Sequence, residues 1–339
     1  MYQVAICGAQ GYVGQALLSQ IKKHPQLALK AFISRRPEEA QDLQGASVFP
    51  VSALPEVLNS IDILLLATPP ETSMEIIATL NPEKTFVVDL SGAFRLPAEE
   101  FSEWYGMPHQ CPEKLNLPYG LSPWNYEHLK NHSMVSNPGC YATCALMPLI
   151  PLLKEGVIES QDIIIDAKSG VSGAGKKLLP HLMFCEVANN FFPYRIGKHQ
   201  HTPEIQKALR QFGKVEADIL LTPHLLPIER GISMTIYGKA TSFFKDDAAI
   251  LKAIEAAYET AYSNYPLLQY EKISEEEAYP PFLFLKQVAH TPFTRVGYYV
   301  KNKRVCIFSC IDNLLKGAAS QAIENINAHY EWPVETGLI

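Results

Sequence analysis

Three glycines near the N-terminus, Gly8, Gly11 and Gly14, limit the possible folds of this chain more than any other feature. They follow an apolar run, residues 2–7, that predicts a buried strand, and they precede residues 15–23, which predict a helix. Glycines at such a turn let the backbone approach a pyrophosphate, which then lies at the N-terminus of the helix. The spacing therefore predicts a dinucleotide-binding loop, with a purely structural turn in an α/β fold as the alternative.

Alternating strands and helices are expected beyond this loop. The strands are expected at residues 27–34, 61–68 and 85–90, and the helices at residues 55–60 and 73–80. Such alternation is typical of a parallel, doubly wound sheet. Residues 97–123, which are rich in Pro, Tyr and Trp, predict an irregular excursion rather than further sheet.

The pattern changes after residue 140. Strands are expected at residues 163–167, 218–223, 233–239 and 304–311, and helices at residues 246–262 and 312–329. This arrangement favours a mixed or antiparallel sheet. The predicted fold class is α/β, with a Rossmann-type doubly wound domain and a second, α+β domain.

The residues after the second expected strand indicate which dinucleotide binds. Ser34, Arg35 and Arg36 stand where NAD-binding proteins place an acidic residue that holds the ribose 2′-hydroxyl, and no carboxylate follows until Glu38. A guanidinium binds the 2′-phosphate of NADP through two hydrogen bonds. NADP is therefore the expected cofactor, with a solvated basic turn as the alternative.

Cys140 is the strongest candidate nucleophile. It follows a turn signal, Asn137-Pro138-Gly139, and precedes the apolar residues 145–150, which predict a short buried helix. The thiol is expected at a helix N-terminus, where unpaired N–H groups and the helix dipole favour the thiolate that attacks carbonyl carbon. A buried structural cysteine is the alternative.

Residues 169–177, called here the second glycine loop, follow another expected strand. Gly170, Gly175 and Lys176 come close to a Walker motif, but Lys177 replaces the hydroxyl residue that would hold Mg²⁺, so no nucleoside triphosphate site is expected. The N–H groups of the loop form a candidate anion site near a phosphate or the nicotinamide. A flexible connecting loop is the alternative.

His199 and His201 are the candidate acid/base partners of the thiol. Thr202 as a cap and Pro203 in the first turn predict a helix start, so both imidazoles are expected just ahead of a helix. We favour His201 as the acid/base and His199 as a substrate contact. Two surface histidines, or a metal-binding pair without an evident third ligand, are the alternatives.

Composition limits the possible partners. A net charge of −6 without a basic stripe gives no indication of nucleic acid or of a membrane surface. The seven cysteines show no CxxC spacing, which argues against a disulfide scaffold and a zinc site, so no metal is expected. The N-terminal residues lack a signal-peptide pattern and the apolar runs are too short to span a bilayer, so a cytoplasmic protein is expected.

Taken together, these motifs resemble those of the N-acetyl-γ-glutamyl-phosphate reductases of arginine biosynthesis, a family related to the aspartate-semialdehyde dehydrogenases. The matching segments are residues 8–14, 89–96, 136–143, 169–176, 199–204, 223–231 and 312–319. They cover essentially the whole chain, and the cysteine motif and the last segment are specific to the family. A Gly-His pair that the aspartate-semialdehyde enzymes carry near Arg230 is absent, which disfavours an aspartyl substrate.

The resemblance implies that residues 1–140 and 312–339 form an NADP-binding Rossmann-type domain, and that residues 141–311 form an inserted domain for substrate binding and oligomerisation. A homo-oligomer is expected. The residues assigned to catalysis are Cys140, His201 and His199. Those assigned to the cofactor are Gly8, Gly11, Tyr12, Val13, Gly14, Ser34, Arg35, Arg36, Ser91, Ser169, Gly170, Gly173 and Asn313. Those assigned to the substrate are Arg95, Asn137, Arg195, Glu204 and Arg230.

The reaction that the resemblance implies is the NADPH-dependent reduction of an acyl phosphate, N-acetyl-γ-glutamyl phosphate, to N-acetylglutamate 5-semialdehyde and phosphate. It would pass through a thioester and a thiohemiacetal on Cys140. Three alternatives remain: a lysine-pathway reductase of aminoadipyl phosphate, an aspartate-semialdehyde dehydrogenase, and a non-catalytic redox regulator that binds NADP.

Overall fold

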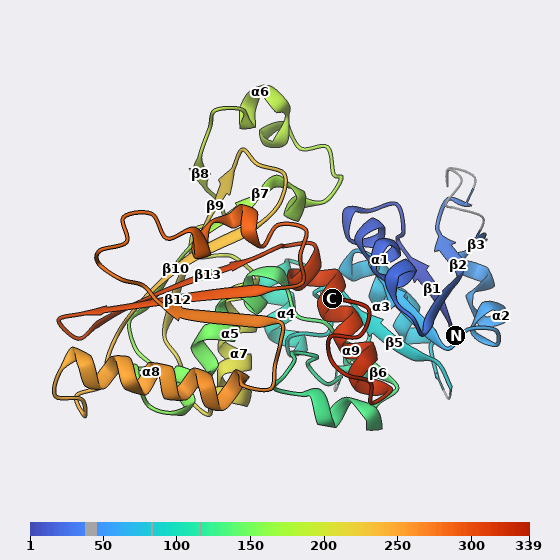
Figure 1. Ribbon diagram of the computed structural model, residues 1–339. Coiled ribbons are helices and arrows are strands. Elements are labelled where there is room, and N and C mark those ends of the chain that lie inside the picture. Colours follow the sequence, from blue (N-terminus) through green and yellow to red (C-terminus); the bar gives the residue numbers. More distant parts are fainter. Residues whose placement is uncertain (38–45, 83, 116) are drawn as a thin grey trace. The chain divides into compact units, whose positions relative to one another are not determined.

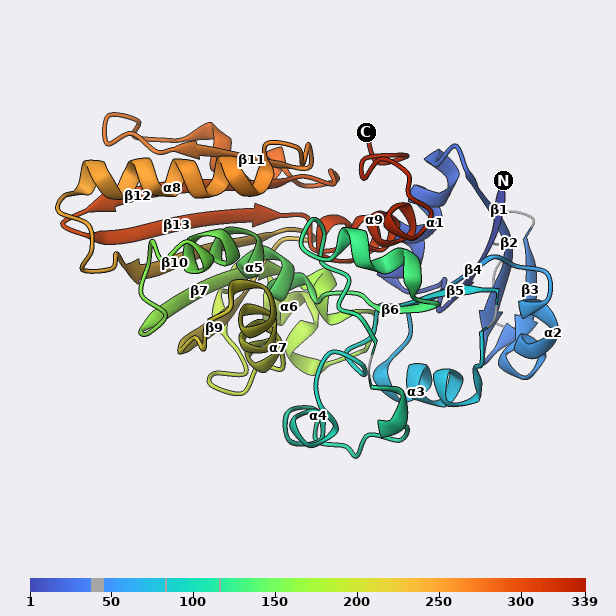
Figure 2. The same cartoon turned by 90° about the horizontal axis from the view of Figure 1, so that it is seen from below.

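The computed structural model describes residues 1–37, 46–82, 84–115 and 117–339. The chain divides into two compact units, whose elements are labelled in Figures 1 and 2. Unit 1 comprises Met1–Gly139 and Ala318–Ile339, and unit 2 comprises Cys140–Gly317. Cys140 and residues 312–317, which the sequence assigned to the first domain, therefore belong to unit 2.

Unit 1 is built on a parallel sheet whose described strands follow the order β3-β2-β1-β4-β5-β6. These strands are β1 (Tyr2–Cys7), β2 (Leu27–Ser34), β3 (Ser47–Pro50), β4 (Ile63–Leu66), β5 (Phe86–Asp89) and β6 (Met134–Ser136). Each neighbouring pair is parallel. The predicted doubly wound sheet is confirmed, and its strand order reverses between β1 and β4, the place where such sheets bind nucleotides.

Helices cover this sheet on both faces. The described helices of unit 1 are α1 (Tyr12–Lys23), α2 (Leu54–Leu58), α3 (Pro70–Thr79), α4 (Ala98–Tyr105) and α9 (Ser320–His329). Successive residues of β1 point to opposite faces, and Ala5 and Ile6 are both fully buried. Two-sided burial explains why the strands are almost continuously apolar. The expected irregular excursion at residues 97–123 is partly wrong, because it contains α4, which ends at a left-handed Gly106.

Unit 2 contains a mixed sheet whose described strands follow the order β11-β12-β13-β10-β7-β9-β8. The strands are β7 (Ile163–Gly170), β8 (Phe192–Pro193), β9 (Ile219–Leu226), β10 (Ile232–Lys239), β11 (Leu268–Lys272), β12 (Thr294–Lys301) and β13 (Arg304–Ile311). Four of the pairs are antiparallel, whereas β7–β9 and β11–β12 are parallel, among the residues described here. The expected mixed sheet is confirmed.

Three helices lie against one face of the mixed sheet (Figures 1 and 2). They are α5 (Cys140–Lys154), α7 (His201–Ala208) and α8 (Asp247–Tyr262), while the short α6 (Phe184–Val187) belongs to the segment between β7 and β8. The helix expected at residues 312–329 starts later, because a π-helical turn (Leu315–Ala319) precedes α9. Strands β3, β6, β8, β11 and β12 were not expected, since they are short or carry polar and glycine residues that break a simple alternation.

Helix α5 is buried along almost its entire length, although it contains Pro148 and Pro151. A proline has no N–H group, so the carbonyl four residues earlier loses its helical donor. The Ser309 hydroxyl of β13 donates to the carbonyl of Cys144 at 2.8 Å, which replaces the donor missing at Pro148. The Tyr262 hydroxyl of α8 donates to the carbonyl of Met147, which replaces the donor missing at Pro151. Two side chains of the surrounding layers thus complete the backbone of α5.

Replacement of Tyr262 by Phe should therefore leave the Met147 carbonyl buried without a donor and lower the free energy of unfolding by about 1–3 kcal/mol. The same substitution in a Pro151→Ala background should cost clearly less, because the alanine of that variant supplies the helical N–H that proline lacks. Urea unfolding of the four proteins of this double-mutant cycle measures the difference.

Tyr258→Phe is the matched control, since Tyr258 lies one turn earlier on α8 and donates to the Pro148 carbonyl at 3.3 Å. That carbonyl keeps a potential helical donor at residue 152, so Pro151→Ala should not rescue Tyr258→Phe. An equal cost of Tyr262→Phe in both backgrounds would contradict the compensation.

Candidate active site

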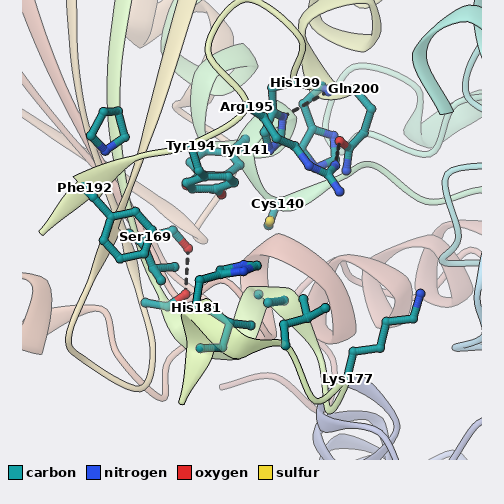
Figure 3. Close-up of a pocket in the computed structure, with 18 residues that line it drawn as sticks. Cys140, Tyr141, Ser169, Lys177, His181, Phe192, Tyr194, Arg195, His199 and Gln200 are labelled. Carbon is teal, nitrogen blue, oxygen red and sulfur yellow. Dashed lines mark hydrogen bonds between the residues drawn. The ribbon is translucent and has the colours of Figure 1, made fainter. Parts of the chain in front are cut away.

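A cavity of about 710 Å³ in unit 2 contains Cys140. Its wall comes from the start of α5, the second glycine loop, the residues around β8 and the start of α7 (Figure 3). The lining residues are Cys140, Tyr141, Ser169, Gly170, Gly173, Ala174, Lys177, Leu179, His181, Leu182, Phe192, Pro193, Tyr194, Arg195, His199, Gln200, His201 and Leu225. Segments from distant parts of the sequence therefore meet around one thiol.

Cys140 is the first residue of α5 and is partly exposed to the cavity. The expected position at a helix N-terminus is found, although the helix is longer than the sequence predicted. Cys144, one turn later, is fully buried, and burial raises the pKa of its thiol well above the usual value. Gly317 packs directly against Cys140, since a Cβ atom on Gly317 would lie 2.7 Å from the Cβ of Cys140.

His201 and Glu204 form a buried ion pair beside Cys140. The Nδ1 atom of His201 lies 2.6 Å from Oε2 of Glu204, and the two residues are 7% and 1% exposed. Burial alone would lower the pKa of His201. The Glu204 carboxylate and a hydrogen bond with Cys140 outweigh burial, so the pKa of His201 is raised. The imidazole can therefore carry a proton next to the thiol at neutral pH.

The local helix start differs from the expectation. Helix α7 begins at His201, because the backbone of Gln200 is already helical, so Thr202 lies inside the first turn and is not the cap. His201 and Glu204 are consequently three residues apart on one helix and face the same side. Glu204, expected to contact the substrate, has its carboxylate on His201 instead.

His199 has the opposite electrostatic character. Burial, reinforced by the nearby charges of His201 and Arg195, lowers the pKa of His199 to about 2. Its Nδ1 atom accepts the backbone N–H of His201 at 3.3 Å, which leaves the proton of the neutral ring on Nε2. His199 therefore acts as a neutral hydrogen-bond donor on the cavity wall.

Two tyrosines that the sequence analysis missed also line the cavity. The hydroxyls of Tyr141 and Tyr194 lie 2.9 Å apart, and both rings meet the His199 ring nearly edge-on (Figure 3). Burial raises the pKa of both phenols, so they remain neutral. Tyr141 directly follows Cys140 in the sequence, which was an available signal, whereas no local pattern connected Tyr194 with Cys140.

The second glycine loop is held by the backbone of residues 228–231. The N–H groups of Gly170, Val171 and Ser172 donate to the carbonyls of Gly231, Ile228 and Glu229 at 2.9, 2.9 and 3.1 Å. A Cβ atom on Gly170 would lie 2.7 Å from the Glu229 carbonyl oxygen, so glycine is needed there. The Ser169 side chain is buried and donates to the Gly170 carbonyl at 3.0 Å.

Two further residues that the sequence predicted for the site, Arg230 and Asn313, do not line this cavity and form bonds elsewhere in unit 2. The Nε atom of Arg230 lies 3.3 Å from Oδ2 of Asp312, and Nη1 of Arg230 lies 2.8 Å from Nδ1 of His290. Asn313 is 2% exposed and bonds to the Gly231 N–H and the Ser172 hydroxyl. Arg195, in contrast, is exposed on the cavity wall beside Gln200 and is available to an anion (Figure 3).

The N-terminal glycines occupy the strand-to-helix turn of unit 1. Gly8 has φ +81°, and a Cβ atom there would lie 2.3 Å from the Ala67 carbonyl oxygen. A Cβ atom on Gly14 would lie 2.4 Å from the Gly8 carbonyl oxygen. A small cavity of about 70 Å³ joins Gly8 and Gly11 to Ser34 at the end of β2. Tyr12 and Val13 begin the first turn of α1. Gly11 is the N-cap residue of this helix, and no side chain forms a hydrogen bond that caps it.

The basic residues after β2 are on the surface. Arg35 forms an exposed ion pair with Glu75 of α3, and the Arg36 N–H donates to the Ser34 hydroxyl at 3.1 Å. An exposed pair of this kind contributes little stability, so Arg35 can exchange Glu75 for a phosphate. Glu38 lies outside the described residues.

Three more residues that the sequence predicted for the site, Ser91, Arg95 and Asn137, are buried in unit 1. Ser91 bonds to Asp89 through its N–H at 3.2 Å and its hydroxyl at 2.8 Å. Arg95 is 6% exposed and donates to the carbonyls of Asn137 and Leu90 at 2.9 and 3.0 Å. The Asn137 amide is fully buried and bonds to Asn325. Their polar groups hold the turns of unit 1 in place.

Two further properties concern the residues that the structure describes. Within these residues, no group of three or more His, Cys, Asp or Glu side chains has an arrangement that could hold a metal ion. None of the helices in the described ranges combines the length and apolar character that crossing a membrane requires.

Comparison with known proteins agrees with this architecture. Residues 140–313 match the family described as semialdehyde dehydrogenase, dimerisation domain, and residues 3–132 match semialdehyde dehydrogenase, NAD binding domain. In solved structures, the chain is similar to aspartate semialdehyde dehydrogenase II from Vibrio cholerae, with a TM-score of 0.74, 16% identity and coverage of 98% of this chain and 99% of the other. That likeness concerns the fold.

Curated relatives are more similar in sequence. N-acetyl-γ-glutamyl-phosphate reductase from Geobacillus stearothermophilus is 37% identical, with 100% of this chain and 98% of the relative covered. The enzyme of the same name from Staphylococcus saprophyticus is 33% identical at the same coverage. Because this similarity runs through both units, the chain belongs to the N-acetyl-γ-glutamyl-phosphate reductase family.

Proposed function

We propose that the protein reduces N-acetyl-γ-glutamyl phosphate to N-acetylglutamate 5-semialdehyde and phosphate, with NADPH as the hydride donor. The observation that carries this proposal is the Cys140–His201–Glu204 arrangement in a cavity of unit 2. A thiol at a helix N-terminus, paired with a protonatable imidazole, is suited to forming and releasing an acyl group. Membership of the reductase family supports the substrate.

Unit 1 offers a fitting site for the dinucleotide. The close backbone approaches at Gly8 and Gly14 leave no room for side chains, and the N-terminus of α1, where no side chain forms a cap, is the place at which a pyrophosphate would bind. Ser34 borders the small cavity beside Gly8 and Gly11, and Arg35 and Arg36 follow it in the sequence as cations for the 2′-phosphate. When bound, NADPH supplies the hydride that reduces the acyl group.

The first chemical step belongs to Cys140 and His201. The Cys140 thiolate attacks the acyl carbon, and the C–O bond to phosphate breaks, with its electron pair leaving on the phosphate. A thioester remains on Cys140. The positively charged His201 stabilises the thiolate before attack, and Glu204 holds the imidazole in the orientation that directs Nε2 toward the reacting group.

Reduction turns the thioester carbonyl into an oxyanion, which His201 protonates to give a thiohemiacetal. Backbone N–H groups at the start of α5 are suited to stabilise this oxyanion. His201 then takes the hydroxyl proton back as the C–S bond breaks, which releases the aldehyde and restores the thiolate. We assign His199 and Arg195 to substrate binding, as a neutral donor and as a cation for the α-carboxylate.

We also propose that two copies of the chain associate through the open face of the mixed sheet. Ile164, Leu220 and Tyr237 are directly opposite one another on β7, β9 and β10, and they are 44%, 54% and 44% exposed. A row of exposed apolar side chains on one sheet face is typical of a protein interface. The match of unit 2 to a dimerisation domain supports this assignment.

The direct test of the activity is an assay of NADP reduction that depends on both phosphate and N-acetylglutamate 5-semialdehyde. Turnover that requires both compounds is expected. Aspartate semialdehyde and the aminoadipyl analogue, tested in parallel, should be poor substrates, and a preference for either would replace the proposed substrate.

Cys140→Ser should lower kcat by on the order of 10³-fold or more, because a hydroxyl at neutral pH is a far poorer nucleophile than a thiolate. NADPH binding, measured by fluorescence titration, should be nearly unchanged. Cys144→Ala is the control, since Cys144 is buried one turn away. Substantial residual turnover in Cys140→Ser would remove this residue from its role.

Ser34→Asp combined with Arg35→Ala and Arg36→Ala should weaken NADPH selectively relative to NADH, because the 2′-phosphate loses two cations and meets a carboxylate. The ratio of kcat/KM for the two cofactors is the measurement. Lys30→Ala removes an exposed cation from the same strand and should leave the ratio as it is. An unchanged ratio in the triple variant would mean that the phosphate is recognised elsewhere.

His201→Asn should lower kcat by roughly 10²–10⁴-fold, whereas His199→Asn should act mainly on the KM of the acyl phosphate.

Glu204→Gln should change the pH dependence of kcat. The Glu204 carboxylate raises the pKa of His201, and activity that needs protonated His201 is lost as the pH rises through that value. Without the carboxylate, the alkaline limb of the kcat–pH profile should move to lower pH. A limb that stays in place would assign the ionisation to another group.

A further inference from the structure

One segment of unit 2 carries large apolar side chains that are exposed to solvent. It comprises residues 178–191, which connect the second glycine loop to β8 and contain α6, and it is called the arm. Leu178, Met183 and Phe184 are 99%, 64% and 83% exposed. In Figure 1 the arm stands out from the mixed sheet on the side away from α8. Three such side chains so close together in the sequence indicate an interaction surface.

The arm is continuous with the open face of the mixed sheet. On β9, His224 is four residues from Leu220, so both side chains point to the open face. The ring of Phe191, the last residue of the arm, stacks on the ring of His224, with 4.9 Å between the ring centroids. The exposed surface therefore runs from the apolar row on β7, β9 and β10 through Phe191 to the arm.

The same segment forms part of the wall of the Cys140 cavity. Leu179, His181 and Leu182 line that cavity, and Figure 3 shows His181 on its wall. They stand between the exposed apolar residues of the arm in the sequence. The Leu182 N–H donates to the Leu179 carbonyl at 2.9 Å, which joins the two cavity-lining leucines in one turn. A partner that covers the outer side of the arm would therefore also fix this wall.

We propose that a second copy of the chain covers the arm and that this contact completes the wall of the cavity around Cys140. The match of unit 2 to a dimerisation domain and the continuity of the arm with the open sheet face favour a second copy over a different protein. In a symmetric dimer the same surface patch of each subunit forms the interface, so one continuous face is sufficient. The inference rests on the proposed function for the substrate and for the dimer face.

Association would lower the free-energy cost of binding the substrate. The arm contains two short helical segments, Pro180–Leu182 and α6, and helices of this length are not stable by themselves. A second copy packed against the arm would order it before the substrate arrives, and such preorganisation raises affinity. The acyl phosphate should therefore bind more tightly to the dimer than to the single chain.

Leu178→Ser combined with Phe184→Ser should weaken association at least about tenfold, because both side chains lose their apolar contact with the second copy. Both are almost fully exposed in the single chain, so its folding should be unaffected. Sedimentation equilibrium measures the dissociation constant. An unchanged constant in the double variant would overturn the assignment of this surface. So would an unsubstituted protein that stays monomeric throughout the micromolar range, since another partner would then have to cover the arm.

The kinetics of the same double variant test the link to the cavity. Below its dissociation constant, the KM of the acyl phosphate should be about tenfold higher than in the unsubstituted dimer, and it should fall again as the protein concentration rises. A raised KM that does not respond to protein concentration would mean that the arm acts within one chain. That result would overturn the role of the second copy, as would an unchanged KM in the dissociated variant.

Phe243→Ser is the matched control. Phe243 is 86% exposed, but it lies in the connection between β10 and α8, outside the arm and the cavity wall. This variant should associate like the unsubstituted protein and keep the same KM of the acyl phosphate. An equal weakening of association in Phe243→Ser would show that any exposed phenylalanine has this effect and would overturn a specific role for the arm.

Hydrogen–deuterium exchange provides a readout that does not need activity. In the unsubstituted protein, amides of residues 178–191 should exchange more slowly above the dissociation constant than below it. Equal exchange at both concentrations would overturn the contact. If the arm is protected on association but the unsubstituted protein does not reduce the acyl phosphate, the contact is supported and the proposed function is contradicted.

Discussion

The burial of helix α5 is the constraint on which unit 2 depends. The residues from Tyr141 to Leu153 are all buried, and the helix contacts the mixed sheet, α7 and α8. A helix that is apolar on every side must be enclosed by other elements. Because α5 cannot rotate or slide in that enclosure, its first residue has a defined position. The same packing against α7 brings the start of that helix, with His201, to the thiol of Cys140.

The two histidines show how position within this enclosure determines chemistry. His199 and His201 are two residues apart and both almost fully buried. Burial favours the neutral form of an imidazole in both cases. His201 gains a carboxylate as a hydrogen-bond partner and becomes basic, whereas His199 bonds through Nδ1 to a backbone N–H and stays neutral. Two side chains of the same type are thereby suited to different roles, His201 to proton transfer and His199 to hydrogen-bond donation.

Local patterns predicted the elements well and their long-range partners poorly. Strands β1, β2 and β13 have the expected bounds, and Cys140 begins a helix, because apolar runs, Gly and Pro determine such features locally. The pairing of Glu204 with His201 depended on where α7 starts, which is two residues earlier than the sequence predicted. The partners of Arg230 and Asn313 come from segments far away in the chain, and no local pattern contains that information.

The contact between Gly317 and Cys140 has a consequence for the connectivity of the whole chain. These are the last and the first residues of unit 2, and a Cβ atom on one would nearly touch the other. The flanking ends of unit 1 are also near each other, since the Asn137 amide donates to the Ala318 carbonyl at 3.3 Å. Unit 1 is therefore interrupted by a folded insertion whose two ends meet, and its halves are joined as if by a short loop. The entropic cost of closing such a loop is small, however long the inserted segment is.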